Sequence, residues 1–366
     1  MATDFGIFLL LQQRSYNRPS FDIVHQAVEQ VKVADEVGFG GAWFAEHHFN
    51  NYGLCASPLL MAAHCAGVTQ RIRLGSGVVI APMYTPSRLI AEAAMVDQLS
   101  NGRLNLGIGA GYQQFEFERF GVTLAEAKDR TLEMIDMLEL GLTQKQFSYA
   151  GQYYQQPPSA ISQRAVQSPM PPLWVTSMDP ALMRRAIRAG HHLFISGSEV
   201  GHDKLKGARR IVDRIALEEG RDPAAQRVGM LHFGFASDNP AEVDHYLDCA
   251  RYQRRLALSL KERRAATSDD YMVEETPFPG EPTLEDMRAR LPVGPVDTVI
   301  ERMVRDIRVA GPCHVALQTQ CGDLDHATML RQIRLWGEVI IPAVQQEIAN
   351  DPPYVSPLLA EAAVAA

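Results

Sequence analysis

Short apolar runs alternate with longer amphipathic segments along most of this chain. The first apolar run covers residues 5–11 (FGIFLLL), and in residues 21–37 the apolar positions recur at close to helical spacing before Gly38. Residues 41–46 and 57–67 repeat this order of an apolar run and an amphipathic segment. Alternation of this kind is typical of repeated strand–helix units that build a parallel sheet.

Continued to the end of the chain, the pattern predicts eight strands, at residues 5–11, 41–46, 72–82, 103–111, 172–177, 191–196, 227–237 and 312–318. It predicts helices at residues 21–37, 57–67, 86–99, 124–142, 179–190 and, as a closing helix, 326–346. Eight strands with helices between them fit a closed barrel better than an open doubly wound sheet. We therefore predict an α/β fold, a single TIM-type (β/α)8 barrel with an excursion between strands seven and eight.

One domain is expected over residues 1–350. Within it, a charged, Pro-containing stretch at about 237–294 separates strands seven and eight and is interpreted as a lid-like insertion. Residues 147–172 are rich in Pro, Gln and Ser and are predicted to form an ordered surface excursion. Residues 351–366 are expected to form a C-terminal tail.

Composition narrows the class of protein. The chain has 366 residues, 46% hydrophobic and 21% charged, as expected of a globular protein. Its formal net charge is -8 and no segment gathers Lys and Arg, so no nucleic-acid partner is expected. The chain lacks a long apolar stretch and a basic N-terminal flank, so we expect a cytoplasmic protein with no membrane partner. The five cysteines lack CxxC spacing, which predicts reduced thiols and no metal site.

Candidate chemistry is sought where the predicted strands end, because the active site of such barrels forms at the carboxyl ends of the strands. Glu46 and His47 follow the second apolar run. An ordinary imidazole has a pKa of about 6.5 and exchanges protons at neutral pH, which makes His47 the candidate base. His48 is expected to point away, since neighbours on an extended segment face opposite sides. Glu46 is expected to orient an imidazole or a backbone amide.

Three segments in this order, GFGGAWFAEHHF, LGSGVVIAP and DQLSNGRLNLGIGAGY, resemble the bacterial luciferase-like family of flavin-dependent monooxygenases. The resemblance implies a luciferase-like barrel that uses reduced FMN as a diffusible cosubstrate. A separate NAD(P)H:flavin reductase would supply the reduced FMN. Dioxygen and a small, apolar organic substrate would then react by way of a flavin peroxide. The resemblance also implies a homodimer or a homotetramer.

The resemblance assigns roles to matching residues. It makes His47 the base that acts at the flavin and the substrate, and it implies a non-prolyl cis peptide between Gly77 and Val78, where glycines leave room for the isoalloxazine ring. Two further groups of residues are expected to contact the cofactor: Gly109, Ala110 and Tyr112 after strand four, and Ser177, Met178 and Asp179 after strand five, the latter at the flavin phosphate.

Two features keep the phosphate assignment open. Asp179 is equally suited to cap the following helix. Light-emitting luciferases carry a Cys-Arg pair, whose Arg contacts the phosphate, where this chain has Gly109-Ala110. The chain therefore resembles the wider monooxygenase family.

Other interpretations of the same residues are possible. A deazaflavin-dependent enzyme that transfers hydride, or a non-catalytic flavin-binding relative, would share the barrel and its glycines. A metal site built from His47, His48, His191 and His192 is disfavoured, because adjacent histidines do not readily face one ion. The GIGAG pattern after strand four lacks the acidic partner of a dinucleotide fold, so no bound dinucleotide is expected.

Overall fold

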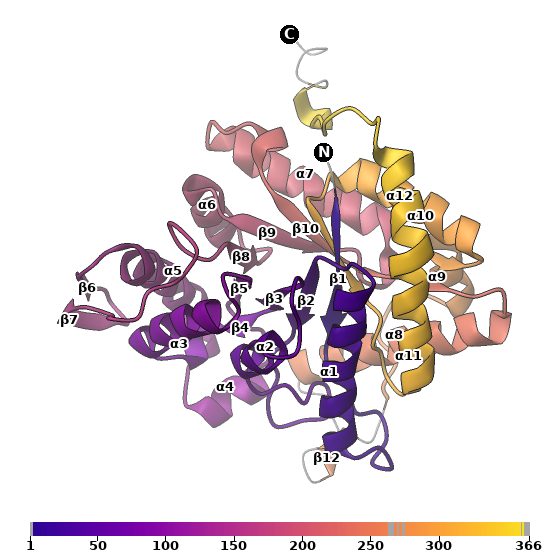
Figure 1. Ribbon diagram of the computed structural model, residues 1–366, viewed down its shortest axis with the longest axis horizontal. Coiled ribbons are helices and arrows are strands. Elements are labelled where there is room, and N and C mark those ends of the chain that lie inside the picture. Colours follow the sequence, from indigo (N-terminus) through magenta and orange to yellow (C-terminus); the bar gives the residue numbers. More distant parts are fainter. Residues whose placement is uncertain (1–2, 263–266, 269–270, 273–274, 360, 362–366) are drawn as a thin grey trace.

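The computed structural model describes residues 3–262, 267–268, 271–272, 275–359 and 361, and its centre is a barrel of parallel strands (Figure 1). The barrel strands are, in order around the barrel, β1 (Asp4–Leu9), β2 (Gly41–Phe44), β3 (Arg73–Ser76), β5 (Leu104–Gly109), β8 (Leu173–Thr176), β9 (His192–Ser196), β10 (Val228–Phe233) and β15 (His314–Gln318). β15 pairs in parallel with β1 and closes the barrel. The predicted TIM-type (β/α)8 fold is confirmed.

The third barrel strand differs from its prediction. It was expected as one run over residues 72–82, but it consists of β3 and β4 (Val79–Ile80), separated at a cis peptide bond between Gly77 and Val78. β4 pairs with the end of β5. The two residues at this break therefore lie at the carboxyl end of the barrel.

Helices surround the barrel on its outer side (Figure 1). They are α1 (Ser20–Glu36), α2 (Pro58–Ala66), α3 (Pro86–Leu99), α5 (Ala127–Thr143), α6 (Pro180–Ala189), α7 (His202–Glu218), α10 (Val296–Ala310), α11 (His326–Leu335) and α12 (Ile341–Ile348). The predicted closing helix is confirmed as α11 and α12, joined by a π-helical turn at Trp336–Ile340. The sequence pattern did not predict α7 or α10.

Two excursions extend from the barrel. The predicted surface excursion contains an antiparallel hairpin of β6 (Phe147–Ala150) and β7 (Gln155–Ser159). Between β10 and β15 the chain forms β11 (Phe235–Ala236), α8 (Pro240–Lys261), β12 (Thr267–Ser268), β13 (Tyr271–Met272), α9 (Leu284–Arg290) and β14 (Val293–Gly294). The 22-residue α8 dominates the segment predicted as a lid, and its buried face packs against α9. The lid role itself stays a prediction.

Aromatic side chains fill the interior of the barrel. The ring of Trp43 meets those of Trp174 and Phe194 edge-on, with centroids 5.2 and 4.8 Å apart. A side chain on Gly75 would lie 2.3 Å from the Trp43 ring, so glycine is required there. Trp43 Nε1 donates to His314 Nε2 (2.8 Å), and His314 Nδ1 donates to Asp4 Oδ2 (3.0 Å). The interior is thus a packed core and not a channel, as is usual for such barrels.

A buried carboxylate fixes the chain segment before β3. Asp35, in the last turn of α1, accepts hydrogen bonds from the backbone amides of Gln70, Arg71 and Ile72 at 2.8, 3.0 and 2.7 Å. Burial by itself raises the pKa of Asp35, but the three amide donors outweigh it and hold the pKa below its ordinary value. Because the pKa is depressed in the folded state, the stabilisation is present above the unfolded-state pKa of about 3.9 and is lost as pH falls below it.

Asp35→Asn is therefore expected to lower the free energy of unfolding at pH 7 by about 1.5–3 kcal/mol, because hydrogen bonds to a charged group are lost. The difference from wild type should shrink as pH falls below about 4, because Asp35 is protonated there in the unfolded chain and at still lower pH in the folded one. Urea unfolding across this pH range measures it. Asp238→Asn, at an exposed aspartate, is the matched control. A deficit that is the same at pH 3 and pH 7 would contradict the assignment.

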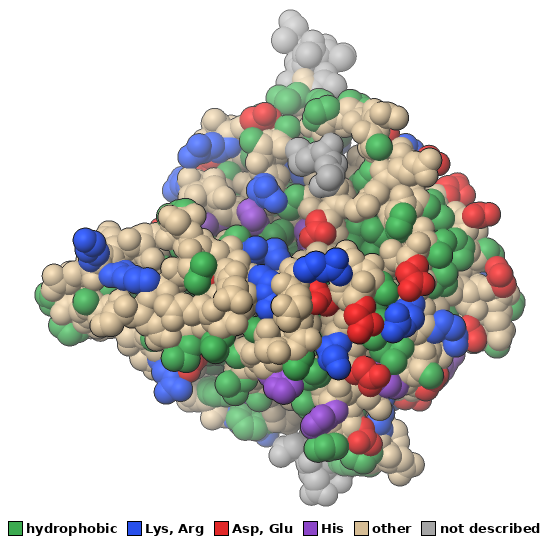
Figure 2. Space-filling model, viewed as in Figure 1, with side chains coloured by type: hydrophobic (Ala, Val, Ile, Leu, Met, Phe, Trp, Pro, Cys, Tyr) green, Lys and Arg blue, Asp and Glu red, His purple; other side chains and the backbone are tan. Residues whose placement is uncertain are grey.

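The surface carries charges of both signs. Figure 2 shows acidic and basic side chains interspersed over the face on which α1 and α11 lie. None of the described helices is both long enough and apolar enough to cross a lipid bilayer.

Candidate active site

The carboxyl ends of the barrel strands enclose a cavity of about 470 Å³, here called the main cavity. Its volume lies within the range of small-molecule and cofactor sites. Every predicted site residue except Asp179 lines it: Glu46, His47, Gly77, Val78, Gly109, Ala110, Tyr112, Ser177 and Met178. Residues predicted at the ends of four different strands therefore lie around one cavity.

The cis peptide bond between Gly77 and Val78, implied by the family resemblance, is present. Gly77 N donates to the carbonyl of Phe44 (2.7 Å), which ties the break to the end of β2. A side chain on Gly77 would lie 2.9 Å from the ring of Phe8. This stretch therefore presents backbone and the side chain of Val78 to the main cavity, a surface that a flat ring can approach closely.

His47 lines the main cavity and is held by Glu116 and Tyr52, which line it too. Its side chain is 10% exposed, and its Nδ1 lies 3.1 Å from Glu116 Oε1. The edge of its ring packs against Tyr52, with centroids 4.6 Å apart. Glu116 is nearer to Nδ1 than Gln113 Nε2, which lies at 3.3 Å. With the carboxylate accepting from Nδ1, that nitrogen carries the proton in the neutral ring and Nε2 is left as the acceptor. A carboxylate that fixes the tautomer of an imidazole is a common arrangement around a proton-transferring histidine.

Glu116 is a site residue that the sequence analysis missed. It lies on α4 (Gln114–Phe120), a short helix that was not predicted, and it is only 1% exposed. Its Oε1 also accepts from the backbone amide of His48 (2.7 Å), while its buried Oε2 has no partner among the described residues. The sequence offers little that separates Glu116 from the exposed Glu118 two residues later. Its inward direction depends on the packing of α4 around the fully buried Phe117.

Glu46 contacts other residues of the site through both of its carboxylate oxygens. Its Oε1 lies 2.8 Å from His48 Nε2, and its Oε2 accepts from the amide of Ile80 (3.0 Å) and the hydroxyl of Tyr84 (2.9 Å). Glu46 thus orients the imidazole of His48 and the backbone amide of Ile80. Burial and the neighbouring Glu46 raise the pKa of Tyr84, so this hydroxyl stays protonated and donates. His48 packs against Phe120 (4.7 Å) outside the main cavity.

The structure places Asp179 in its alternative role. Its carboxylate accepts from the amides of Ala181 (2.8 Å) and Leu182 (3.3 Å) and is the N-cap of α6. Its own amide donates to Ser177 Oγ (3.0 Å). A carboxylate at the start of α6 would repel a phosphate, so contact between Asp179 and a flavin phosphate is not supported. Ser177 and Met178 still face the main cavity.

Two further hollows adjoin the main cavity. An apolar one of about 190 Å³ extends it toward the interior and is floored by Trp43 and Phe194. The other, of about 380 Å³, shares Tyr52, Tyr112 and Gln253 with the main cavity and is here called the polar lobe. The structure therefore holds one composite cleft, and the helix α8 contributes the outer wall of the polar lobe.

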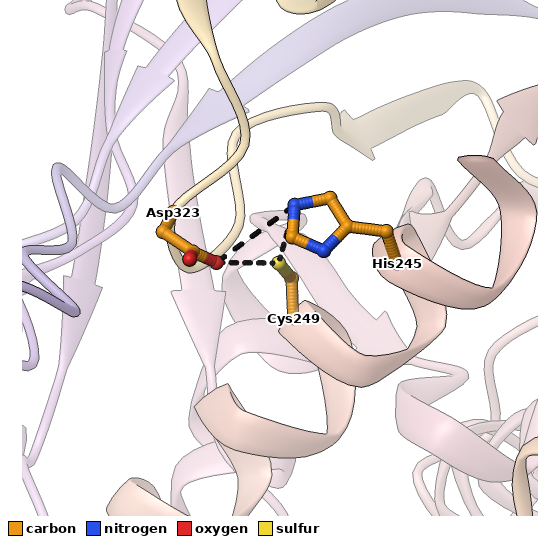
Figure 3. A group of neighbouring side chains, drawn as sticks. All are labelled: His245, Cys249 and Asp323. Carbon is orange, nitrogen blue, oxygen red and sulfur yellow. Dashed lines mark hydrogen bonds and ion pairs between the residues drawn. The ribbon is translucent and has the colours of Figure 1, made fainter. Parts of the chain in front are cut away.

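A separate cluster of possible metal ligands lies away from this cleft. His245 and Cys249 on α8 face Asp323, and the Cys249 thiol lies 3.2 Å from Asp323 Oδ1 (Figure 3). The guanidinium of Arg14 lies 3.4 Å from the same oxygen and 3.9 Å from the thiol. A cation already neutralises this cluster, so we interpret it as an ion-pair contact that joins α8 to the loop after β15. Burial raises the pKa of Cys249 to about 12, which disfavours the thiolate a metal needs.

All five cysteines are buried and free. Burial raises the pKa of both Cys55 and Cys65, the two nearest the predicted motif, to about 12. Such thiols are packing residues and poor nucleophiles.

Comparison with known proteins adds to this geometry. A family model described as luciferase-like monooxygenase matches residues 3–312. Uncharacterized protein y4vJ of Sinorhizobium fredii is 47% identical over 95% of this chain and 99% of its own length. The oxygenase component of flavin-dependent trigonelline monooxygenase from Acinetobacter baylyi is 31% identical over 65% of this chain and 66% of its own length.

Solved structures share the fold. The oxygenating constituent of 3,6-diketocamphane monooxygenase from Pseudomonas putida, in complex with FMN, superposes with a TM-score of 0.73 at 20% identity, over 93% of this chain and 98% of that one. An F420-dependent secondary alcohol dehydrogenase superposes with a TM-score of 0.71 at 20% identity, over 94% of this chain and 99% of that one. At such identities these likenesses show the fold alone.

Proposed function

This chain belongs to the luciferase-like monooxygenase family, and from that premise we propose that it is the oxygenase component of a two-component system. In this proposal reduced FMN arrives from a separate NAD(P)H:flavin reductase, and dioxygen oxidises a small organic substrate. The name of the Acinetobacter relative, an oxygenase component of a flavin-dependent monooxygenase, supports the two-component arrangement. A homodimer or homotetramer stays part of the proposal.

The observation that carries this proposal is that His47 and the cis peptide of Gly77 and Val78 both line the main cavity. The cavity suits a flavin in shape and chemistry. Val78, Ile80 and Leu231 give it apolar walls, and its volume of about 470 Å³ fits an aromatic cofactor. The buried Glu116 Oε2, which has no partner among the described residues, is an acceptor that a bound ligand can satisfy.

The residues of this chain would divide the work as follows. Reduced FMN supplies the electrons with which dioxygen is activated. His47 accepts or returns a proton at Nε2, while Glu116 at Nδ1 stabilises the imidazolium that forms. The walls of Val78, Ile80 and Leu231 keep water from the reacting atoms. We also propose that residues 237–294 cover the cleft, because α8 supplies Gln253, Arg254 and Ala257 to its outer wall.

The test begins with cofactor choice. The purified protein is titrated with FMN, riboflavin and deazaflavin, first oxidised and then reduced, and oxygen uptake is followed with candidate substrates. The proposal expects FMN to bind and oxygen uptake to require chemically reduced FMN, with no oxidation of NADH by this chain alone. Selective binding of deazaflavin without oxygen uptake would support a hydride-transfer enzyme. Flavin binding with no turnover across the substrate set would support a non-catalytic relative.

Glu116→Gln is expected to lower kcat by about tenfold or more while KM for the substrate changes little. A hydrogen bond to a charged group contributes about 1.5–3 kcal/mol, and this one acts on the imidazole and not on the substrate. Steady-state oxygen uptake at saturating reduced FMN measures it. Glu118→Gln, on the exposed side of α4, is the control, and Glu116→Asp should recover part of kcat. If KM rises and kcat is unchanged, Glu116 contacts substrate and does not position His47.

A further inference from the structure

The polar lobe differs in character from the main cavity. Arg254 and Lys261 from α8 line it, together with Glu199 from the turn after β9. Lys204, on α7, lies close enough to Glu199 and Arg254 for both charges to affect its pKa. Burial lowers the pKa of Lys204, and Arg254 lowers it further against the opposing effect of Glu199. The lining of the lobe thus holds two basic side chains, Arg254 and Lys261, and one carboxylate, Glu199.

Arg254 is placed to bind an anion. Its Nε lies 3.1 Å from Glu199 Oε1, with the Arg254 side chain 34% exposed and that of Glu199 8% exposed. A guanidinium carries five N–H donors in a fixed fork, so an ion pair through Nε does not exhaust them. The fork matches the two oxygens of a carboxylate or a phosphate. Glu199 therefore holds the guanidinium near the lobe by an ion pair, and the N–H groups of Arg254 are not used up by it.

Amide and hydroxyl donors complete the junction with the main cavity. Gln318 Nε2 donates to Gln253 Oε1, which leaves the NH2 group of Gln253 as the donor on the shared wall. Tyr52 and Tyr112 stand at the same junction, and their pKa values, raised by burial, are also sensitive to Arg254. The ring of Tyr52 packs on His47. The lobe that Arg254 lines is therefore continuous, at Tyr52, Tyr112 and Gln253, with the cavity that His47 lines.

We propose that the polar lobe binds the carboxylate of a small organic acid and that this acid is the substrate, with its oxidisable end beside His47. The inference rests on the proposed function and changes the expected substrate from an apolar molecule to one with an anionic end and an apolar body. A flavin phosphate offers the same oxyanion chemistry. The position favours the substrate, because the lobe opens beside His47, where the reacting end of a substrate must lie.

Benzoate and benzamide test the charge, because they differ little in shape. Calorimetric titration of the FMN-loaded protein is expected to show that benzoate binds about tenfold more tightly than benzamide. One charge-assisted contact to the carboxylate accounts for a difference of this size. The ratio should fall to about one in Arg254→Gln and recover in part in Arg254→Lys. Arg251→Gln, one turn earlier on α8 and paired with Asp248, removes the same charge outside the lobe and should leave the ratio unchanged.

A second arm identifies the source of the anion. FMN and riboflavin are titrated into wild type and Arg254→Gln. If Arg254→Gln weakens FMN but not riboflavin, or if FMN displaces benzoate, the lobe holds the flavin phosphate and the inference is overturned. It is also overturned if neither probe binds or if both bind equally in wild type. If FMN fails to bind while benzoate still prefers Arg254, the proposed function fails and the anion site stands.

Discussion

His47→Ala is expected to lower the rate of coupled substrate oxidation by about 10²- to 10⁴-fold while FMN binding changes little. That is the usual contribution of a positioned acid–base group, and Ala leaves no group to move a proton at this point of the cavity. The imidazole adds little to the surface that the cofactor would contact, since it is only 10% exposed and braced by Glu116 and Tyr52. Product formation and hydrogen peroxide release, measured together under reduced FMN, separate lost coupling from lost binding.

Alanine variants of two other histidines serve as controls for this experiment. His48→Ala removes a partner of Glu46 outside the main cavity, so a smaller loss is expected. His64→Ala, in the last turn of α2 and exposed, should leave turnover unchanged. Equal losses in His47→Ala and His48→Ala would show that the pair acts through the loop they share, and His47 would lose its assigned role.

Trp43→Ala is expected to lower the free energy of unfolding by about 3–5 kcal/mol, the cost typical of removing a buried indole. Trp43 is 1% exposed and fills the space that Gly75 leaves open, against Trp174 and Phe194. Few neighbours can collapse into the gap, because the barrel strands hold the surrounding backbone apart. Urea unfolding followed by far-UV circular dichroism measures the change.

Trp43→Phe separates volume from hydrogen bonding. The ring keeps most of the packing, so the loss should be smaller, about 1–3 kcal/mol, from leaving His314 Nε2 without its donor. Leu60→Ala, on an exposed leucine of α2, should cost little. A Trp43→Ala protein as stable as wild type would mean that the interior repacks freely, contrary to the tight contacts at Gly75.

The sequence predicted the barrel because all eight barrel strands and most of the helices between them carry their own local signal; α7 and α10 do not. Strand three was the exception. Its apolar run continues from Ile72 through Pro82, and the pattern of side chains alone does not reveal a peptide that turns at Gly77. Only the family resemblance identified that bond. Local hydrophobicity thus located the strand, but a backbone conformation leaves no periodic trace in the sequence.

Only part of the candidate site was predicted, because only some of its residues have a local signal in the sequence. His47 follows an apolar run directly, so its place at a strand end could be deduced. Glu116 sits on a short helix among aromatic and acidic residues, and its inward direction is set by tertiary packing around Phe117. Asp179 satisfied two local rules at once, and the helix-capping rule prevailed.

The polar lobe was not predicted at all. Its charged wall comes from α8, in a segment interpreted only as a lid, while Glu199 follows β9 and Gln318 ends β15. Residues so far apart in sequence meet only through closure of the barrel, which no local pattern encodes.

The aromatic packing inside the barrel limits the routes by which substrate can enter the cleft and product can leave it. With Trp43, Trp174 and Phe194 blocking the axis, nothing that occupies the cleft can leave through the opposite end of the cylinder. Substrate entry and product release must therefore both take place on the side of the barrel where the strands end.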